Sequence, residues 1–240
     1  PSSHLRLPLN QLGELGVTAD YRDLSAQLGP ITVVAGHARD LTIQPSTATL
    51  RTSDPKLVFE VTGVDALGNA TTDLGPLTWQ IEVGSFGDFD TQSATLTPRQ
   101  VGEGRISVTS GYGSKAVTGL ISVSTGVATE LSIEPATLGL RADDPPVQLT
   151  VTGRDALGHT TSELGELTWS IASGSISAID ADGLFEPVRT GVGTVAVMSS
   201  LGARAQSGNF EVRPGRASSF SFAPTTWTGT VGDAPATFTS

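Results

Sequence analysis

Apolar and polar side chains alternate with a period of two along several short stretches of this chain. Leu57, Phe59 and Val61 share one side of one such stretch, and residues 147–151 repeat the arrangement. Successive side chains of a β-strand point to opposite faces of a sheet, so this pattern predicts strands with one buried face. No stretch carries an apolar stripe with the 3.6-residue period of a helix. The chain is therefore predicted to be all-β.

Further strands are expected where apolar residues recur between turn-forming residues. They are expected at residues 77–81, 105–110, 119–124, 194–200 and 208–213. Residues that favour turns separate the strands at intervals of about a dozen residues, which is typical of a β-sandwich.

A long segment of the chain occurs twice. Residues 41–81 align without a gap with residues 131–171, ninety positions later, and 22 of these 41 positions are identical. Further along, the offset becomes 89, so that Pro98 corresponds to Pro187. A repeat of this length is the size of a domain, which predicts tandem domains rather than a solenoid of small repeats.

The repeat divides the chain into four parts. Residues 1–37 correspond to the carboxyl-terminal part of a preceding unit, whole units occupy 38–126 and 127–215, and residues 216–240 correspond to the amino-terminal part of a following unit. Neither end piece contains enough strands to close a core alone. We therefore expect the native polypeptide to continue in both directions.

A turn and a tryptophan recur in each whole unit. Asp-Ala-Leu-Gly occurs at residues 65–68 and again at 155–158, and Asp and Gly favour a sharp turn because Gly accepts positive φ. The chain then returns to the core through Leu-Thr-Trp, so Trp79 and Trp169 are predicted to anchor the two cores between their sheets. Truncation of either side chain to Ala should cost ~3–5 kcal/mol. A Trp that stacks on a ligand is the alternative interpretation.

Charge and composition narrow the classes of partner. The formal net charge is −10, so no basic surface is available to neutralise phosphates, and nucleic-acid binding is not expected. The same charge disfavours adsorption to anionic lipid, and no apolar run approaches the ~20 residues of a membrane-spanning helix, so no membrane insertion is expected. Cysteine is absent, which excludes disulfides, thiolate metal sites and a Cys nucleophile.

Motifs for catalysis are absent from the sequence. The histidines are His4, His37 and His159, and none has a second His or a suitably spaced carboxylate near it. The sequence contains neither the G-x-S-x-G nucleophile motif nor a phosphate-binding loop. The chain is predicted not to be an enzyme, with no catalytic and no cofactor-binding residue.

Carboxylates supply the only candidates for a metal site. Asp40 and Glu130 hold equivalent positions beside the junctions between units, and Asp180 and Asp182 belong to the run Ile-Asp-Ala-Asp-Gly. Oxygen ligands from two neighbouring units could share one calcium ion at a junction. The run lacks the further Glu and the flanking helices of an EF-hand, so a plain Asx-type turn is the favoured interpretation of it. Calcium at an inter-domain junction is the alternative.

The second whole unit contains a set of motifs typical of one family: LSIEP (131–135), VTGRDALGH (151–159), LTWSI (167–171), SAIDADGLF (177–185), GVGTVAV (191–197) and NFEV (209–212). The unit resembles bacterial immunoglobulin-like domains of the Big superfamily, which occur in tandem in intimin- and invasin-type surface proteins. The first whole unit matches nearly as well, with GDFDTQSATLTP in place of the Asp-x-x-Gly turn.

The resemblance implies tandem immunoglobulin-like β-sandwiches arranged as an elongated array. In such proteins the repeated units act as rigid spacers, so the leading hypothesis is a non-enzymatic stalk segment of a bacterial extracellular or cell-surface protein, whose partners are the neighbouring units of its own polypeptide. A subunit of an extracellular filament, assembled by β-strand complementation between copies of the chain, is a second hypothesis. A module that binds a host protein or a glycan is a third, and an accessory region of an enzyme is a fourth.

Overall fold

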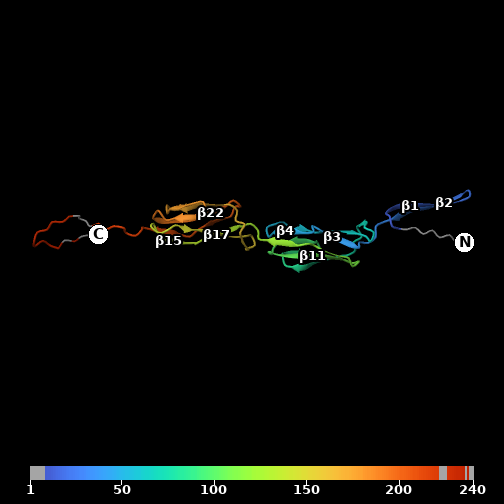
Figure 1. Ribbon diagram of the computed structural model, residues 1–240, viewed down its shortest axis with the longest axis horizontal. Coiled ribbons are helices and arrows are strands. Elements are labelled where there is room, and N and C mark those ends of the chain that lie inside the picture. The colour runs from blue at the N-terminus through green and yellow to red at the C-terminus, as the bar shows by residue number, and fades with distance from the viewer. Residues whose placement is uncertain (1–8, 222–225, 236, 238–240) are drawn as a thin grey trace. The chain divides into compact units, whose positions relative to one another are not determined.

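Strands, turns and irregular segments make up the whole of the described structure. The computed structural model describes residues 9–221, 226–235 and 237, and no helix occurs within them. Contacts between residues divide the chain into two compact units, Pro1–Gly126 and Val127–Ser240. The predicted fold class is confirmed in that the chain is all-β and contains immunoglobulin-like β-sandwiches in tandem (Figure 1).

Thirteen strands lie in the first unit, counted over its described residues 9–126. The first two form a separate hairpin, and the remaining strands build a sandwich. The strands are β1 (Gly13–Tyr21), β2 (Leu24–Val33), β3 (Asp40–Gln44), β4 (Ala48–Arg51), β5 (Leu57–Val58), β6 (Glu60–Val64), β7 (Ala70–Thr71), β8 (Leu77–Gly84), β9 (Asp88–Asp90), β10 (Thr95–Thr97), β11 (Gly102–Ser110), β12 (Lys115–Val117) and β13 (Ile121–Ser124).

The first sandwich has two layers. In one layer, β6 lies between β3 and β7, and β10 lies between β5 and β9. Phe59 connects β5 directly to β6, and its amide donates to the carbonyl of Ala94 at 2.8 Å, which joins these two groups of strands. In the other layer, β8 lies along one edge of β11, and β12 and β13 lie along the opposite edge.

The first strand of the sandwich changes layers. β3 pairs with β6 in antiparallel fashion, whereas β4 pairs in parallel with β13 in the other layer. Pro45 lies in the crossing between them, and without an amide proton it cannot continue the ladder of β3. The crossing places the first and last strands of the sandwich side by side at one edge.

The core of the first sandwich receives buried side chains from both layers. Phe59 from one layer and Trp79 from the other have ring centroids 6.4 Å apart, and Phe89 completes the cluster at 6.0 Å from Trp79. Trp79 is 9% exposed, so its predicted role as a core anchor is confirmed. Ile81, which alternation placed on the same apolar face, is instead 38% exposed, close to a register shift between β8 and β11.

The second unit repeats this topology with a core of its own. β15 pairs in parallel with β24, as β4 does with β13 in the first unit. Its buried cluster contains no residue of the first unit. The strands are β14 (Glu130–Glu134), β15 (Leu138–Arg141), β16 (Val147–Gln148), β17 (Thr150–Arg154), β18 (Thr160–Thr161), β19 (Leu167–Ser173), β20 (Ala178–Ile179), β21 (Leu184–Glu186), β22 (Gly191–Ser199), β23 (Arg204–Gln206) and β24 (Phe210–Arg213).

Trp169 differs from its counterpart in the first unit. It packs against the second core but is only partly buried, so the predicted anchoring role holds for it in part. A Cβ added to Gly183 would lie 2.8 Å from the indole, so the ring rests directly on this glycine. Phe185 and Phe210 are fully buried in this core, and their rings meet edge to face at 5.3 Å.

Large and small side chains are exchanged between the two cores. Two positions that hold Phe in the first core hold an aliphatic residue in the second, and two other positions show the reverse. The overall volume of the core is thereby kept, which is the kind of change that cores tolerate best. The corresponding pairs are Phe59 and Leu149, Phe86 and Ile176, Leu96 and Phe185, and Ile121 and Phe210.

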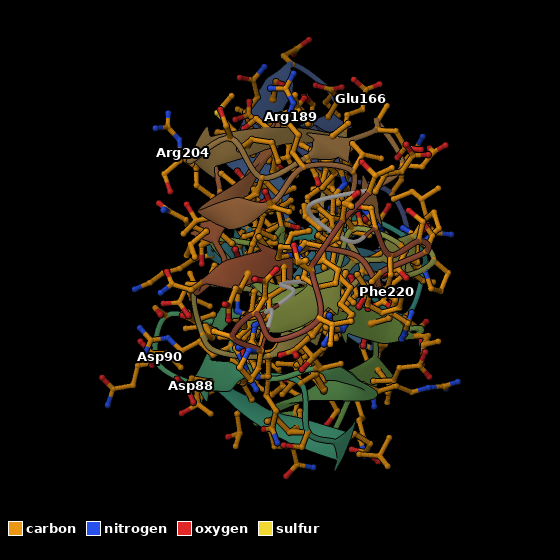
Figure 2. The ribbon with its side chains drawn as sticks, turned by 90° about the vertical axis from the view of Figure 1, so that its left-hand side faces the viewer. Asp88, Asp90, Glu166, Arg189, Arg204 and Phe220 are labelled. Atoms are coloured by element: carbon orange, nitrogen blue, oxygen red, sulfur yellow. The ribbon has the colours of Figure 1, made fainter. Side chains whose placement is uncertain are left out.

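Charged side chains cover the outside of the sandwiches. Figure 2 shows Asp88 and Asp90 of the first unit, and Glu166, Arg189 and Arg204 of the second, pointing away from the sheets. Within the part of the chain that the structure describes, no helix is long and apolar enough to cross a bilayer.

Candidate functional site at the two ends of each sandwich

The segment that leads into the first sandwich is fastened to it by backbone hydrogen bonds. We call residues 36–39 the leading segment. Ala38 is fully buried, its amide donates to the carbonyl of Asp73 at 2.9 Å, and its own carbonyl accepts from the hydroxyl of Ser114 at 3.0 Å. The amide of Arg39 donates to the carbonyl of Val64 at 2.7 Å. Three different parts of the sandwich therefore hold four consecutive residues of the chain.

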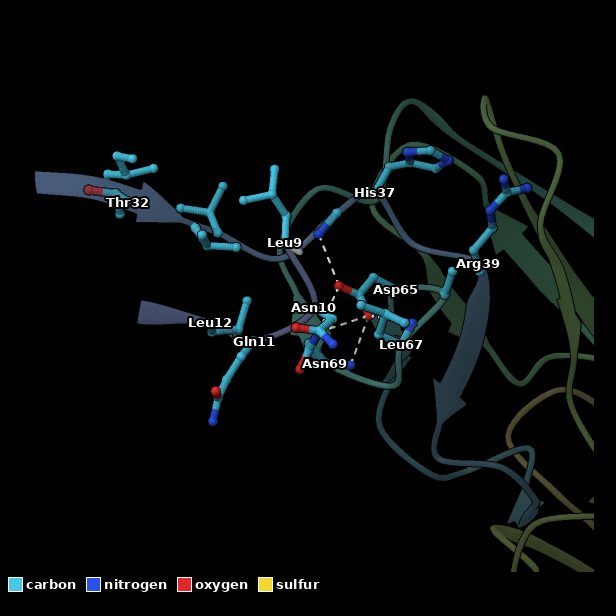
Figure 3. Close-up of a pocket in the computed structure, with 15 residues that line it drawn as sticks. Leu9, Asn10, Gln11, Leu12, Thr32, His37, Arg39, Asp65, Leu67 and Asn69 are labelled. Atoms are coloured by element: carbon cyan, nitrogen blue, oxygen red, sulfur yellow. Dashed lines mark hydrogen bonds between the residues drawn. The ribbon is translucent and has the colours of Figure 1, made fainter. Parts of the chain in front are cut away.

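A buried carboxylate links the leading segment to the Asp-Ala-Leu-Gly turn. Asp65 is 7% exposed, and its Oδ2 accepts from the amide of Gly36 at 3.0 Å. Its Oδ1 accepts from the amides of Leu67 and Asn69, both at 2.9 Å, as Figure 3 shows. The turn closes on the carboxylate because Gly68 adopts a φ of 83°, a conformation that suits glycine. Asp65 is thus a structural acceptor for both the turn and the leading segment.

The electrostatics of Asp65 fit this structural role. The Asn69 side chain donates from Nδ2 to Oδ2 at 3.1 Å, and this bond has the largest effect in lowering the pKa of Asp65 from 3.8 to about 2. The backbone amide of Asn69 has the next largest effect. A carboxylate with so low a pKa, whose oxygens already accept several hydrogen bonds, is poorly suited to act as a general base at neutral pH.

An aromatic contact covers the other side of the leading segment. The rings of His37 and Tyr112 have centroids 4.8 Å apart. The hydroxyl of Tyr112 donates to Oδ1 of Asp73 at 2.7 Å, so the loop after β11 and the loop after β7 are tied together here. His37 is therefore a packing residue of the leading segment. His4 lies outside the described residues.

The second sandwich holds its own leading segment in the same way. Ala128 is 2% exposed, and its amide donates to the carbonyl of Glu163 at 3.0 Å. Asp155, the counterpart of Asp65, accepts from the amides of Leu157 and His159, both at 2.9 Å. Nδ1 of His159 lies 3.1 Å from Oδ2 of Asp155, where Asn69 donates in the first unit. The sequence-based statement that His159 has no carboxylate nearby was wrong, because the turn brings these two residues together.

The segments that leave the sandwiches are also tied down. In the first unit, the amide of Gly126 donates to the hydroxyl of Thr52 at 2.6 Å. In the second unit, the amide and the guanidinium of Arg216 donate to Oδ2 of Asp143 at 3.1 and 3.0 Å. These contacts lower the pKa of Asp143, the backbone amide of Arg216 having the largest effect. We call Gly126 and Arg216 the trailing anchors.

The four calcium candidates occupy different kinds of position. Asp40 and Glu130 are the exposed first residues of β3 and β14. Oδ1 of Asp180 accepts from the amides of Asp182 and Leu184 at 2.9 and 2.8 Å, which makes it the capping residue of an Asx turn. Among the described residues, no group of three or more His, Cys, Asp or Glu side chains is placed to hold one ion. Calcium at a junction stays a prediction.

One cavity opens beside the Asp65 turn. Its volume is about 450 Å³, and it lies between this turn, the leading segment and the base of the β1–β2 hairpin (Figure 3). Apolar residues of segments 9–12 and 31–34 form much of its wall. The carboxylate in the wall is Asp65, whose oxygens are occupied by amide donors. The lining of this cavity is therefore better suited to packing between the hairpin and the sandwich than to catalysis.

Comparisons with known proteins leave the family of the chain open. No family model matches it, and no curated protein matches it. Among solved structures, invasin, a bacterial integrin-binding protein, is 15% identical with a TM-score of 0.46, over 85% of this chain and 46% of that one. The human desmocollin-1 ectodomain is 12% identical with a TM-score of 0.47, over 82% and 45% of the two chains.

A third solved structure is a surface-layer protein. The S-layer protein rSbsC is 13% identical with a TM-score of 0.36, over 90% of this chain and 36% of that one. The chain thus spans less than half the length of each of these three proteins.

Proposed function

We propose that this chain is a non-enzymatic structural segment of an extracellular or cell-surface protein, in which each sandwich sets distance and carries tension. The observation that carries the proposal is that the chain is fastened to the sandwich at both ends, by the leading segment and by the trailing anchor. The resemblance of the repeats to bacterial immunoglobulin-like domains supports the location outside the cell. A domain that acts as a spacer needs such fastening, because loosely attached ends would absorb extension before the fold bears any load.

The pairing of the first and last strands suits a load-bearing role. β4 and β13 run in parallel and pair over four residues, and β15 and β24 do the same. When two parallel neighbours are pulled from the amino end of one and the carboxyl end of the other, they are sheared along their length. All hydrogen bonds between them must then fail together, whereas pulling an antiparallel hairpin apart from its open end breaks them one at a time.

The connection between the sandwiches is short. Gly126 is bonded to the first sandwich and Ala128 to the second, so Val127 is the one residue between these anchored positions. A single residue offers two soft backbone dihedrals, which restrict relative motion far more than a flexible linker does. We therefore propose that the connection limits the swivelling of neighbouring units.

Nuclear magnetic relaxation of backbone ¹⁵N tests this proposal. A Gly-Ser insertion between Val127 and Ala128 should shorten the rotational correlation time of each sandwich, because the units would then tumble more independently. The same insertion after Gly202, in the turn between β22 and β23, is the control and should leave both correlation times unchanged. If the insertion after Val127 has no effect, the native connection does not restrain the units and the spacer function loses its support.

A further inference from the structure

One sheet of the second sandwich, formed by β19, β22, β23 and β24, carries apolar side chains on its solvent side. We call the side of this sheet that points away from the core the outer face. On the central strand β22, Val192, Ala196 and Met198 point outward, and Thr194 is the one polar residue among them. Val192 and Met198 are 55% and 46% exposed. The solvated face of an antiparallel sheet normally carries polar side chains, and an apolar strip there is the kind of surface that a partner covers.

The corresponding face of the first sandwich is closed by an ion pair. Lys115 on β12 and Glu82 on β8 come from opposite edges of β11, and Nζ of Lys115 donates to both carboxylate oxygens of Glu82 at 2.9 Å. The pair crosses the face above Ser107, which is fully buried beneath it. The outward residues of β11 are mostly polar or charged, namely Glu103, Arg105, Ser107 and Thr109.

The second sandwich has a groove where the first has this ion pair. By the repeat, Ala172 and Ala196 hold the positions of Glu82 and Ser107, so neither the carboxylate nor the hydroxyl is present. A groove of about 350 Å³ opens over β19, β22 and β23. Gln206 forms part of its wall and is held there by a hydrogen bond from its Nε2 to the hydroxyl of Thr194, at 2.8 Å.

Opposite charges stand at the two ends of the outer face. Arg204 of β23 is paired with Met198, at one end of β22. Glu211 of β24 is paired with Val192, at the other end. Six residues of an extended strand span about 20 Å, so Arg204 and Glu211 of one copy are too far apart to form an ion pair. Arg204 points away from the sheet (Figure 2), and no ion pair to it occurs within the described part of the chain.

We propose that the outer faces of two copies of the chain pack on each other about a two-fold axis that runs perpendicular to β22 near Val195. The axis reverses the direction of β22 in the second copy, so Met198 of each copy lies over Val192 of the other. β23 and β24 lie along the same edge of β22, as β12 and β13 do along β11. Arg204 of each copy therefore lies over Glu211 of the other.

This arrangement is self-complementary. Each apolar contact and each ion pair occurs twice, and sheets stacked in this way lie about 10 Å apart, which suits interdigitating side chains. Glu211 already accepts two hydrogen bonds at 3.0 Å from Arg213, and a carboxylate has further lone pairs for a second guanidinium. The same surface is used by both copies, so the contact closes at a dimer.

The first sandwich cannot form the same contact. In the same arrangement Glu103 and Arg105 would be covered by uncharged side chains, and burying a charge without a partner is costly. Ser122 holds the position of Glu211, so Lys115 would face no carboxylate across the contact. The proposed interaction therefore belongs to the second sandwich alone. It goes beyond the spacer function and does not rest on it.

Sedimentation velocity of the chain tests the association. The unmodified protein should show a weight-average sedimentation coefficient that rises with concentration toward the value of a dimer. Met198→Asp should remove this rise, because it places a charge in the apolar strip. Thr109→Asp, at the corresponding position of the first sandwich, is the matched control and should leave the rise unchanged. Thermal unfolding of both variants verifies that the sandwiches stay folded.

Charge reversal tests the orientation of the two copies. Arg204→Glu places like charges opposite each other at two places, which should weaken the dimer about tenfold. Glu211→Arg should do the same. The protein that carries both substitutions should regain most of the affinity, because the opposite charges then meet again between copies. Within one copy these positions are too far apart for such a recovery.

Three results would overturn the proposal. They are a monomer at every concentration, an equal loss of association in Met198→Asp and Thr109→Asp, and no recovery in the doubly substituted protein. Growth beyond a dimer would contradict it as well, because a two-fold contact closes. None of these results affects the relaxation test of the spacer function, since that test compares two insertions in chains that share the same outer face.

Discussion

Truncation of Phe185 probes whether each sandwich depends on its own core. Phe185 is fully buried in the second core and meets the ring of Phe210 edge to face at 5.3 Å. Phe185→Ala removes a whole ring from a site closed on every side, and such substitutions typically cost ~3–5 kcal/mol. This loss equals a change of roughly two to four orders of magnitude in the folding equilibrium of that sandwich. It is a large part of the total stability of an ordinary domain, about 5–15 kcal/mol.

Native-state hydrogen exchange reports the two sandwiches separately. Amides of β22 report the second core and amides of β11 the first, because each strand is central to its own sheet. Phe185→Ala should lower the protection of β22 by the full amount and leave β11 unchanged. Leu96→Ala, at the corresponding fully buried position of the first core, should give the opposite pattern. Val188→Ala, at a side chain that is 63% exposed, is the surface control and should change either region by no more than about 0.5 kcal/mol.

A shared loss of protection would refute this reasoning. If Phe185→Ala lowers the protection of β11 and β22 equally, the two units unfold as one cooperative body. The separate cores then do not give the two sandwiches independent stabilities. If neither strand changes, the ring does not contribute to the core as its burial indicates.

Two further predictions concern the turns. Hydrogen bonds lower the pKa of Asp65 from 3.8 to about 2, so its contribution to stability is complete above about pH 4 and is lost as the pH falls through the folded pKa. Acid unfolding followed by circular dichroism should therefore be less steep between pH 4 and 2 in Asp65→Asn. An unchanged slope would contradict this assignment. Gly183→Ala should destabilise the second sandwich by more than Gly158→Ala in thermal unfolding. Both glycines have positive φ, which costs ~1–2 kcal/mol for alanine. Only the Cβ added at position 183 would meet a neighbour, the indole of Trp169 at 2.8 Å. Equal losses of stability in the two variants would show that the indole moves aside at no cost.

Alternation predicted which side of a strand faces the core, because that property is local. Leu57, Phe59 and Val61 point inward in the first sandwich, as residues 147, 149 and 151 do in the second. The exchange of Phe and aliphatic side chains between the two cores could not be predicted from the sequence. Leu96 contributes to the same cluster as Phe59 only through packing between strands that are far apart in sequence.

Only part of the candidate site could be predicted from the sequence. Asp65 and Gly68 indicated a sharp turn, and the turn is present. Its second role, as an acceptor for the amide of Gly36, joins residues 29 positions apart and depends on the path of the leading segment over the turn. The partnership of His159 with Asp155 was missed for a related reason. Alternation describes extended strands, in which residues four positions apart are well separated, whereas the Asx turn folds the chain back and brings these two side chains together.

Single-molecule extension from the two ends of the chain tests the central claim most directly, namely that two separately closed sandwiches are each fastened at both ends. The account predicts two abrupt unfolding events, each releasing the ~89 residues of one unit and lengthening the chain by roughly 250–300 Å. Ala48→Pro, which removes the amide that donates to the carbonyl of Leu120 between β4 and β13, should lower the force of one event and leave the other unchanged. A single event of twice this length, or a gradual extension without force peaks, would contradict the account.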